Sequence, residues 1–117
     1  MSDLNERYLA CWNETDSATR RKLIDELWTE QASYTDPLAD VRGRDAIDAT
    51  IGAVQAQFPG FVFTAGAPVD GHHNQARFGW GLGPEGAEPV IEGFDVVVLD
   101  DSGRIETVLG FLDKVPA

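Results

Sequence analysis

The second half of the sequence consists of four runs of strand length that are separated by short turn sequences. The runs cover residues 61–69, 74–83, 89–100 and 104–115. The connections have residues typical of hairpin turns, at Asp70-Gly71, Gly83-Pro84-Glu85-Gly86 and Asp101-Ser102-Gly103. Because connections this short join antiparallel neighbours, the second half of the chain predicts an antiparallel sheet.

The second of these runs is unusual because it contains three alternate glycines, Gly79, Gly81 and Gly83. Glycine weakens a flat strand and is typical of strong bending or of close approach by another backbone. We therefore expect a strongly curved sheet. A bent sheet wrapped around helices encloses a concave pocket.

The first half of the chain predicts three helices, over residues 4–13, 17–28 and 44–58. Asp3 and Glu6 have the spacing of an N-cap and its reciprocal partner, and Pro59-Gly60 ends the third helix. Apolar residues recur at helical spacing in all three, namely Leu4, Tyr8, Cys11, Trp12, Leu23, Ile24, Leu27, Trp28, Ile47, Ile51, Val54 and Phe58. The basic residues of the second helix are expected on its solvated side, at Arg20, Arg21 and Lys22.

A short strand, broken at Asp36-Pro37, is expected between the second and third helices. Helices followed by strands indicate the α+β class, with the helices on one face of the sheet. At 117 residues the chain has the size of one domain, covering residues 1–117.

The composition excludes several classes of partner. The net charge of −11 argues against nucleic acid and anionic membranes, since both need a cationic surface. The single cysteine, Cys11, has no internal disulfide partner and is expected to be a buried structural thiol. No basic segment followed by an apolar one occurs at the N-terminus, and no apolar run has membrane-spanning length, so a cytoplasmic location is expected.

Asp95 is the strongest candidate for a functional residue. It lies inside the apolar run of residues 90–99, and strand alternation directs it to the same face as Ile91, Val97 and Leu99. An ionised carboxylate on such a face costs several kcal/mol unless it is partnered or its pKa rises. Asp95 therefore marks a site, unless it lies in water at a strand end or is paired with an arginine.

The remaining candidates each have a functional and a structural interpretation. Asp36 is either a general base or the acceptor of an Asx turn before Pro37. Tyr8 is either a hydrogen-bond donor or an amphipathic core residue. Some side chains could contact a ligand in an apolar pocket but also suit a core or, for the arginine, a surface ion pair; they are Trp12, Phe58, Phe78, Trp80 and Arg77.

His72 and His73 follow Asp70-Gly71 and are expected to be exposed. They have no companions at metal-ligand spacing, and the chain has no glycine-rich phosphate loop. We therefore expect neither a metal nor a cofactor.

The order of these elements and two motifs resemble the nuclear-transport-factor-2-like superfamily and, within it, the SnoaL-like polyketide cyclase branch. The motifs are Tyr34-Thr35-Asp36-Pro37-Leu38 with Val41-Arg42-Gly43-Arg44-Asp45-Ala46-Ile47, and Gly93-Phe94-Asp95 on the third of the long strands. The resemblance covers essentially the whole chain and implies a cystatin-like cone. It implies little about activity, because this scaffold hosts isomerases, cyclases, dehydratases, epoxide hydrolases and binding modules.

The ketosteroid isomerase members are similar at three principal positions. The resemblance implies that Tyr8 and a protonated Asp95 are oxyanion-hole donors and that Asp36 is the general base. It also shows one departure, since Ile51 lies at or near the position of a tyrosine that supports the first one in that family.

The leading hypothesis is a cofactor-independent isomerase or aldol cyclase that acts on a small, largely apolar carbonyl compound. The alternatives are a module that binds a small molecule or a protein without catalysis, and a hydrolase or dehydratase that uses the paired aspartates. A homodimer through the sheet is also expected, because family members commonly form one and because the outer face is expected to expose Phe94, Val96, Val98, Val108 and Leu112.

Overall fold

The structure is a computed structural model that describes residues 3–116. It contains the helices α1 (Leu4–Asn13), α2 (Ser17–Leu27) and α3 (Arg44–Gln57). The strands are β1 (Trp28–Thr35), β2 (Asp40–Arg42), β3 (Phe61–Ala65), β4 (Asp70–His72), β5 (Gln75–Pro84), β6 (Ile91–Leu99) and β7 (Ile105–Lys114). No helix within residues 3–116 has both the length and the apolar character needed to cross a membrane.

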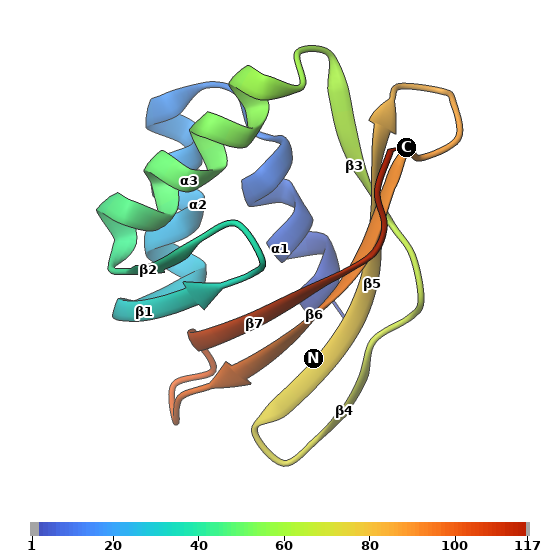
Figure 1. Cartoon of the computed structure of the whole chain (residues 1–117). Coiled ribbons are helices and arrows are strands. Elements are labelled where there is room, and N and C mark those ends of the chain that lie inside the picture. Colours follow the sequence, from blue (N-terminus) through green and yellow to red (C-terminus); the bar gives the residue numbers. More distant parts are fainter. Residues whose placement is uncertain (1–2, 117) are drawn as a thin grey trace.

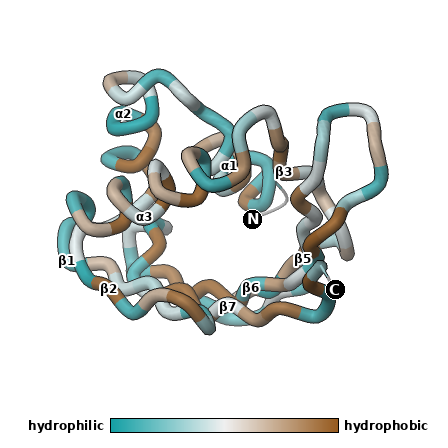
Figure 2. Tube along the Cα trace, turned by 45° about the horizontal axis from the view of Figure 1, so that its top comes forward, coloured by the Kyte–Doolittle hydropathy of each residue, from teal (hydrophilic) through white to brown (hydrophobic). Residues whose placement is uncertain are grey.

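The three helices cover one face of a strongly curved sheet, as the α+β prediction requires (Figure 1). The strand order is β2-β1-β7-β6-β5-β3, and β4 pairs with β5 beyond the end of β3. Seen along the sheet, the helices arch over strands β7 and β6 (Figure 2). This arrangement confirms the predicted fold class of helices packed on a curved sheet.

The sheet is mixed, and this corrects the expectation of antiparallel pairing alone. The pairs β3–β5, β5–β6 and β6–β7 are antiparallel, but β1 pairs in parallel with β7, with Tyr34 opposite Val108. The chain reaches this pairing only after passing through α3 and five other strands. Turn sequences predict pairing only between strands that follow each other in the chain, so they do not predict the pairing of β1 with β7.

The predicted strand over residues 61–69 is too long. Strand β3 ends at Ala65, and β4 begins at Asp70. The turn expected at Asp70-Gly71 is part of β4 instead, and the chain reverses after it at His73, whose φ is +54°. The backbone of Gly79 exchanges hydrogen bonds with Gly66 and Ala67, which keeps the segment between β3 and β4 against β5.

The expected close approaches at the glycines of β5 are confirmed. A Cβ on Gly79 would be 2.6 Å from the backbone nitrogen of Ala67. A Cβ on Gly81 would be 2.7 Å from Cγ of Pro89. Both distances are far too short for any side chain, so these glycines allow neighbouring segments to cross β5 closely.

The core lies between the helices and the concave face of the sheet. Its members include the apolar positions expected at helical spacing, with Tyr8, Cys11, Ile24, Ile47 and Ile51 almost fully buried. Burial of Cys11 confirms the structural thiol and raises its pKa to about 11. The thiol therefore stays protonated and unreactive near neutral pH.

Two details of the helices differ from the predictions. Arg20 is not on a solvated face: it is 8% exposed and pairs with Asp48 of α3 at 2.6 Å, because α2 packs against α3 on that side. The Asp3 side chain makes no capping hydrogen bond to α1.

Two of the residues expected on the outer face of the sheet point inward. Val108 is fully buried in the core, and Leu112 shares its face. The outward positions of β7 are occupied instead by Leu109 and Phe111, which are 41% and 50% exposed. The reason is the bulge between β6 and β7 near Leu99 and Ile105, which sets the side-chain register of β7.

Candidate active-site cavity

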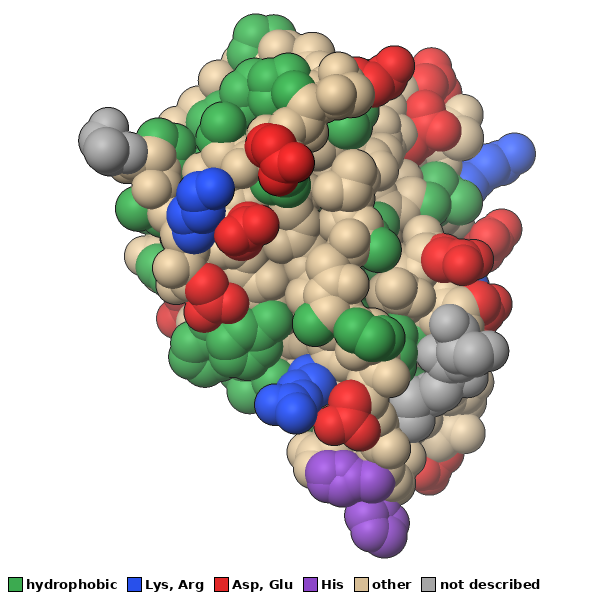
Figure 3. Space-filling model, turned by 90° about the vertical axis from the view of Figure 1, so that its right-hand side faces the viewer, with side chains coloured by type: hydrophobic (Ala, Val, Ile, Leu, Met, Phe, Trp, Pro, Cys, Tyr) green, Lys and Arg blue, Asp and Glu red, His purple; other side chains and the backbone are tan. Residues whose placement is uncertain are grey.

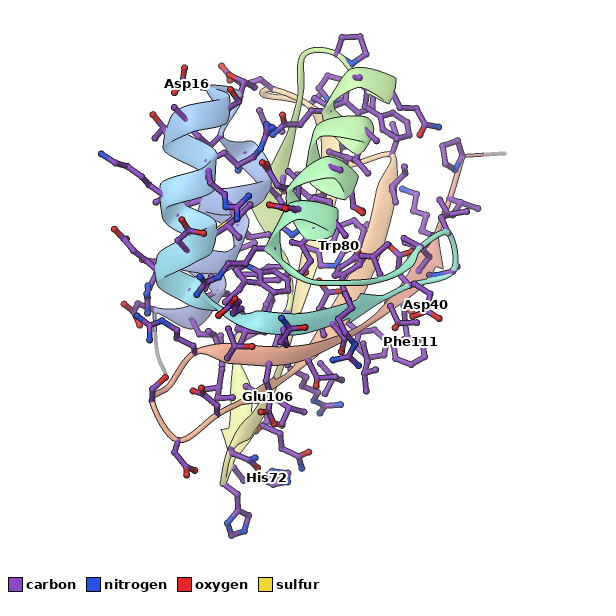
Figure 4. The ribbon with its side chains drawn as sticks, turned by 90° about the vertical axis from the view of Figure 1, so that its left-hand side faces the viewer. Asp16, Asp40, His72, Trp80, Glu106 and Phe111 are labelled. Carbon is purple, nitrogen blue, oxygen red and sulfur yellow. The ribbon has the colours of Figure 1, made fainter. Side chains whose placement is uncertain are left out.

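A cavity of about 150 Å³ lies between the helices and the inner face of the sheet. The side chains that line it are mostly apolar, and the polar ones among them come from α1, from the end of β1, from the end of α3, from β5 and from β6. Figure 4 shows Trp80 in the interior near α3 and Phe111 at the outer side of the sheet. The lining includes the polar or aromatic residues Tyr8, Trp12, Tyr34, Asp36, Trp80 and Asp95, together with Gly110.

Asp95 points into this cavity from the middle of β6. Its side chain lies on the inner face with Ile91 and Val97, as strand alternation predicts, and the residue is 3% exposed. Its pKa is raised to about 6: burial is the main cause and the nearby Asp36 carboxyl adds to it, whereas Tyr8 and Trp80 lower the pKa. Asp95 therefore exchanges its proton near the lower edge of the physiological pH range.

Trp80 is the hydrogen-bond partner of Asp95. Its indole Nε1–H donates to Oδ1 of Asp95 at 3.3 Å, which is a long hydrogen bond. The indole reaches this position because residue 93 is a glycine: a Cβ there would be 2.7 Å from Cζ2 of Trp80. The Gly93-Phe94-Asp95 motif therefore places a carboxyl beside a space for an aromatic ring.

Asp36 enters the same cavity from the turn after β1. Its Oδ1 accepts hydrogen bonds from the backbone N–H groups of Leu38 and Ala39, both at 2.8 Å. This is the Asx turn that the Asp-Pro sequence predicts. Its Oδ2 accepts the hydroxyl of Tyr34 at 2.6 Å. One oxygen thus fixes the side chain to the turn, and the other is held within the cavity.

The hydroxyl of Tyr8 is buried and makes no hydrogen bond within the described residues. Tyr8 is 1% exposed, and its ring packs edge-on against Phe78 at 5.2 Å. Burial, together with the adjacent Asp95, keeps the pKa of Tyr8 well above its usual value of 10.0. The group is a neutral donor near neutral pH. It lowers the pKa of Asp95, although the two groups do not have the geometry of a hydrogen bond.

Of the other candidate residues, some line the cavity and some lie outside it. Trp12, Phe58 and Trp80 line the cavity. Phe78 lies behind the ring of Tyr8 and is not part of the lining. Arg77 is on the outer face, where it pairs with Asp70 at 3.4 Å and is well exposed, so it takes no part in this cavity.

The two histidines lie far from the cavity lining. His72 ends β4 and His73 forms the turn that follows, and both side chains are exposed at the tip of the molecule (Figure 3). Within residues 3–116 no group of three or more His, Cys, Asp or Glu side chains is arranged to hold a metal ion. The lining residues that the structure describes include no Lys, Arg or His, so charge that develops on a ligand here meets hydrogen-bond donors and not cations.

Tyr34 and Gly110 line the cavity but are not identified as candidates by the sequence. Tyr34 lies two residues before Asp36, so strand alternation alone places both on one face. Gly110 is opposite Asp95 on β7, and a Cβ at this position would be 2.8 Å from Oδ1 of Asp95. Gly110 lies beside Asp95 only because β6 pairs with β7, and no pattern in the sequence around Gly110 predicts this contact.

Comparison with known proteins places the chain in a family. The model of the SnoaL-like domain matches residues 5–108, which is most of the sequence. The chain belongs to the SnoaL-like family. This confirms the resemblance inferred from the motifs. No curated protein matches the chain significantly.

Solved structures of SnoaL-like proteins have the same architecture. A candidate isomerase of the SnoaL-like family from Agrobacterium tumefaciens is 43% identical, with a TM-score of 0.90 and 94% of each chain covered. A candidate ketosteroid isomerase from Kribbella flavida is 16% identical, with a TM-score of 0.72 over 99% of this chain and 79% of its own. A candidate polyketide cyclase from Sinorhizobium meliloti is 17% identical, with a TM-score of 0.72 and 94% of each chain covered. The two more distant structures establish the shared fold alone.

Proposed function

We propose that this SnoaL-like protein is a cofactor-independent acid/base enzyme of the isomerase or aldol cyclase type, acting on a small, largely apolar carbonyl compound. The observation that carries the proposal is the Tyr8 hydroxyl. It is buried without an acceptor in the same cavity as Asp36 and Asp95. An unsatisfied buried hydroxyl costs about 1–3 kcal/mol, and a ligand oxygen bound there would remove that cost.

Asp36 is the proposed general base. Proton abstraction beside a carbonyl needs a carboxylate close to the carbon, held in a fixed direction. The Asx turn through Oδ1 supplies the direction, and Oδ2 lies on the side of the cavity. The Tyr34 hydroxyl, bound to Oδ2, fixes its position further.

Tyr8 and Asp95 are the proposed donors to the carbonyl oxygen. Negative charge accumulates on that oxygen as the proton leaves, and donors in a water-poor site stabilise it strongly. Tyr8 is neutral near pH 7, and Asp95 donates only in its protonated form, the share of which is increased by its raised pKa of about 6. Transfer of the proton from Asp36 back to another carbon completes an isomerisation and leaves the enzyme unchanged.

The buried carboxyl of Asp95 and the buried hydroxyl of Tyr8 would serve no purpose in a cavity that only binds an apolar ligand. A buried carboxyl and an orphaned hydroxyl weaken the fold unless they interact with something. Both lie where an oxygen of a ligand would contact them. This argument favours an enzyme over a binding module of the same fold.

The test measures proton exchange from carbon. Thermal-shift screening of cyclic ketones and enones identifies a cavity ligand, and the exchange of its α-proton is then followed in deuterated water. We expect catalysed exchange that falls by about two to four orders of magnitude in Asp36→Asn and by about two to three in Asp95→Ala. Asp113→Asn, at an exposed position outside the cavity, is the matched control and should retain full activity.

Binding without exchange in the wild type would refute the enzyme and leave a binding module. Hydrolysis or dehydration of a bound ligand without exchange would instead support chemistry at the paired aspartates.

A further inference from the structure

The volume of the cavity is limited by a continuous series of aromatic contacts. The ring centroid of Trp12 lies 5.5 Å from that of Tyr34 and 5.3 Å from that of Phe63. Phe63 in turn meets Trp80 edge-on at 5.6 Å. Because these rings support one another, none of them can turn aside without disturbing the next, and the space left is about 150 Å³.

This space matches one ring and no more. An apolar cavity of about 150 Å³ holds a benzene-sized molecule. Pockets for drug-sized ligands have volumes of roughly 300–1,000 Å³. A four-ring ligand therefore does not fit in the cavity unless the aromatic contacts break.

The charge of the lining excludes anions. Asp36 and Asp95 both face the cavity, and its described lining contains no Lys, Arg or His. The carboxyls already repel each other, as the effect of Asp36 on Asp95 shows. A ligand carboxylate placed beside Asp36 would add a negative charge without a counter-ion, and it would oppose ionisation of Asp95 as well, which costs heavily in a site of low dielectric.

The mouth of the cavity is mainly apolar, with Gln57 as an uncharged polar residue among its exposed lining. Leu38 and Val115 line it and are 85% and 58% exposed. Any part of a ligand that extends out of the cavity contacts these side chains first. A short alkyl substituent is compatible with them, and a charged one would be placed against apolar surface.

We infer that the cavity selects a neutral, single-ring ketone or enone, with no more than a short apolar substituent directed to Leu38 and Val115. Its requirement for a carbonyl oxygen rests on the proposed function, whereas its selection by size and charge rests on the lining alone. The site thus rejects multi-ring and anionic carbonyl compounds.

Three probes test this inference by binding to the wild-type protein. They are a methylcyclohexenone, an oxocyclohexene carboxylate of similar size, and the steroid enone androstenedione. Binding is followed by NMR at the indole N–H of Trp80, which lies in the cavity wall. We expect saturable binding of the neutral ring, at least about tenfold weaker binding of the carboxylate, and no shift with the steroid.

A pair of variants tests the size limit. Ile91 lines the cavity at 8% exposure, whereas Ile24 is fully buried in α2 and does not line it. Ile91→Ala should enlarge the cavity and improve the affinity for a two-ring enone such as octalone by about tenfold or more, since a filled cavity recovers lost contacts. Ile24→Ala removes the same atoms elsewhere in the core and should leave that affinity unchanged.

The outcomes separate this inference from the proposed function. If the steroid or the carboxylate binds as tightly as the neutral ring, or if no probe binds, the inference is wrong. Selective binding of the neutral ring without exchange of its α-proton would leave the inference intact and refute the enzyme. Exchange of the α-proton of the steroid would support the enzyme and refute the inference. If Ile91→Ala fails to fold, binding of the three probes to the wild type still tests the inference.

Discussion

Asp36 and Asp95 approach each other over the Cα of Gly110, where no side chain separates them. A Cβ on Gly110 would be 2.8 Å from Oδ1 of Asp95 and 3.2 Å from Cβ of Asp36. The two aspartates come from distant parts of the chain, one from the turn after β1 and the other from β6. They meet because β7 lies between β1 and β6 in the sheet.

Gly110→Ala should therefore damage the site more than the fold. The added methyl group must displace the Asp95 carboxyl, and an error of about 1 Å in a catalytic group lowers the rate by roughly a hundredfold. Gly52→Ala is the control, because its Cβ would meet only Nη2 of Arg20 at 3.4 Å, and alanine is favoured in a helix. Exchange rates and urea denaturation of both variants test this, and a Gly110→Ala protein with full activity would contradict it.

The buried hydroxyl of Tyr8 predicts an opposite effect on stability and activity. Tyr8→Phe removes a donor that has no partner, so the free energy of unfolding should stay constant or rise by about 1 kcal/mol. Activity should fall by about two to three orders of magnitude, as expected when an oxyanion donor is lost.

Tyr34→Phe is the matched variant for this experiment. Its hydroxyl donates to Asp36 at 2.6 Å, so its removal should lower the free energy of unfolding by about 1 kcal/mol. Chemical denaturation compares the two variants directly. If Tyr8→Phe is destabilised as much as Tyr34→Phe, the Tyr8 hydroxyl has a partner and the donor role is not supported.

Local patterns in the sequence were sufficient to predict the inward orientation of Asp95 and the Asx turn at Asp36. Strand alternation depends only on neighbouring residues, and so does the turn chemistry of Asp-Pro. The same holds for the helix faces that bury Ile47 and Ile51. These parts of the fold could be predicted because their physical causes lie within one segment.

The other features depend on contacts between segments. Arg20 faces inward because Asp48 and Gln55 of α3 accept its hydrogen bonds, and helical periodicity contains no information about that neighbour. The parallel pairing of β1 with β7 likewise has no local signal. That the Tyr8 hydroxyl has no partner is a property of everything packed around it, so only the structure reveals it.

The raised pKa of Asp95 predicts how stability depends on pH. The carboxyl ionises at about 6 in the folded protein and near 3.8 in the unfolded chain. Between these values the folded protein binds more protons, so the free energy of unfolding falls as pH rises across this window. The loss attributable to this group is up to about 3 kcal/mol, and it is complete above the folded pKa.

Comparison with Asp95→Asn isolates the effect, because the amide does not titrate. Urea denaturation at several pH values gives the free energy of unfolding of each protein. The value for Asp95→Asn should rise relative to that of the wild type between about pH 4 and 6.5, and the difference between the two proteins should be constant above that range. Parallel curves for the two proteins would mean that Asp95 is solvated, and its role as a protonated donor would then be lost.

The outer face of the sheet predicts self-association. Phe94 and Phe111 stack on it with ring centroids 5.0 Å apart, beside Val96 and the 41% exposed Leu109. An apolar patch that is continuous across two strands is typical of a protein interface. We therefore predict a homodimer through β6 and β7.

Sedimentation equilibrium of the wild type and two variants tests this prediction. Leu109→Glu places a charge at the centre of the patch and should give the mass of a monomer, because an unpaired charge in an apolar interface costs several kcal/mol. Leu38→Glu is the control: Leu38 is also exposed and apolar but lies in the turn before β2, off the outer face, so this variant should remain a dimer. A wild-type protein that sediments as a monomer at micromolar concentration would show that the patch is not an interface between two copies of the chain.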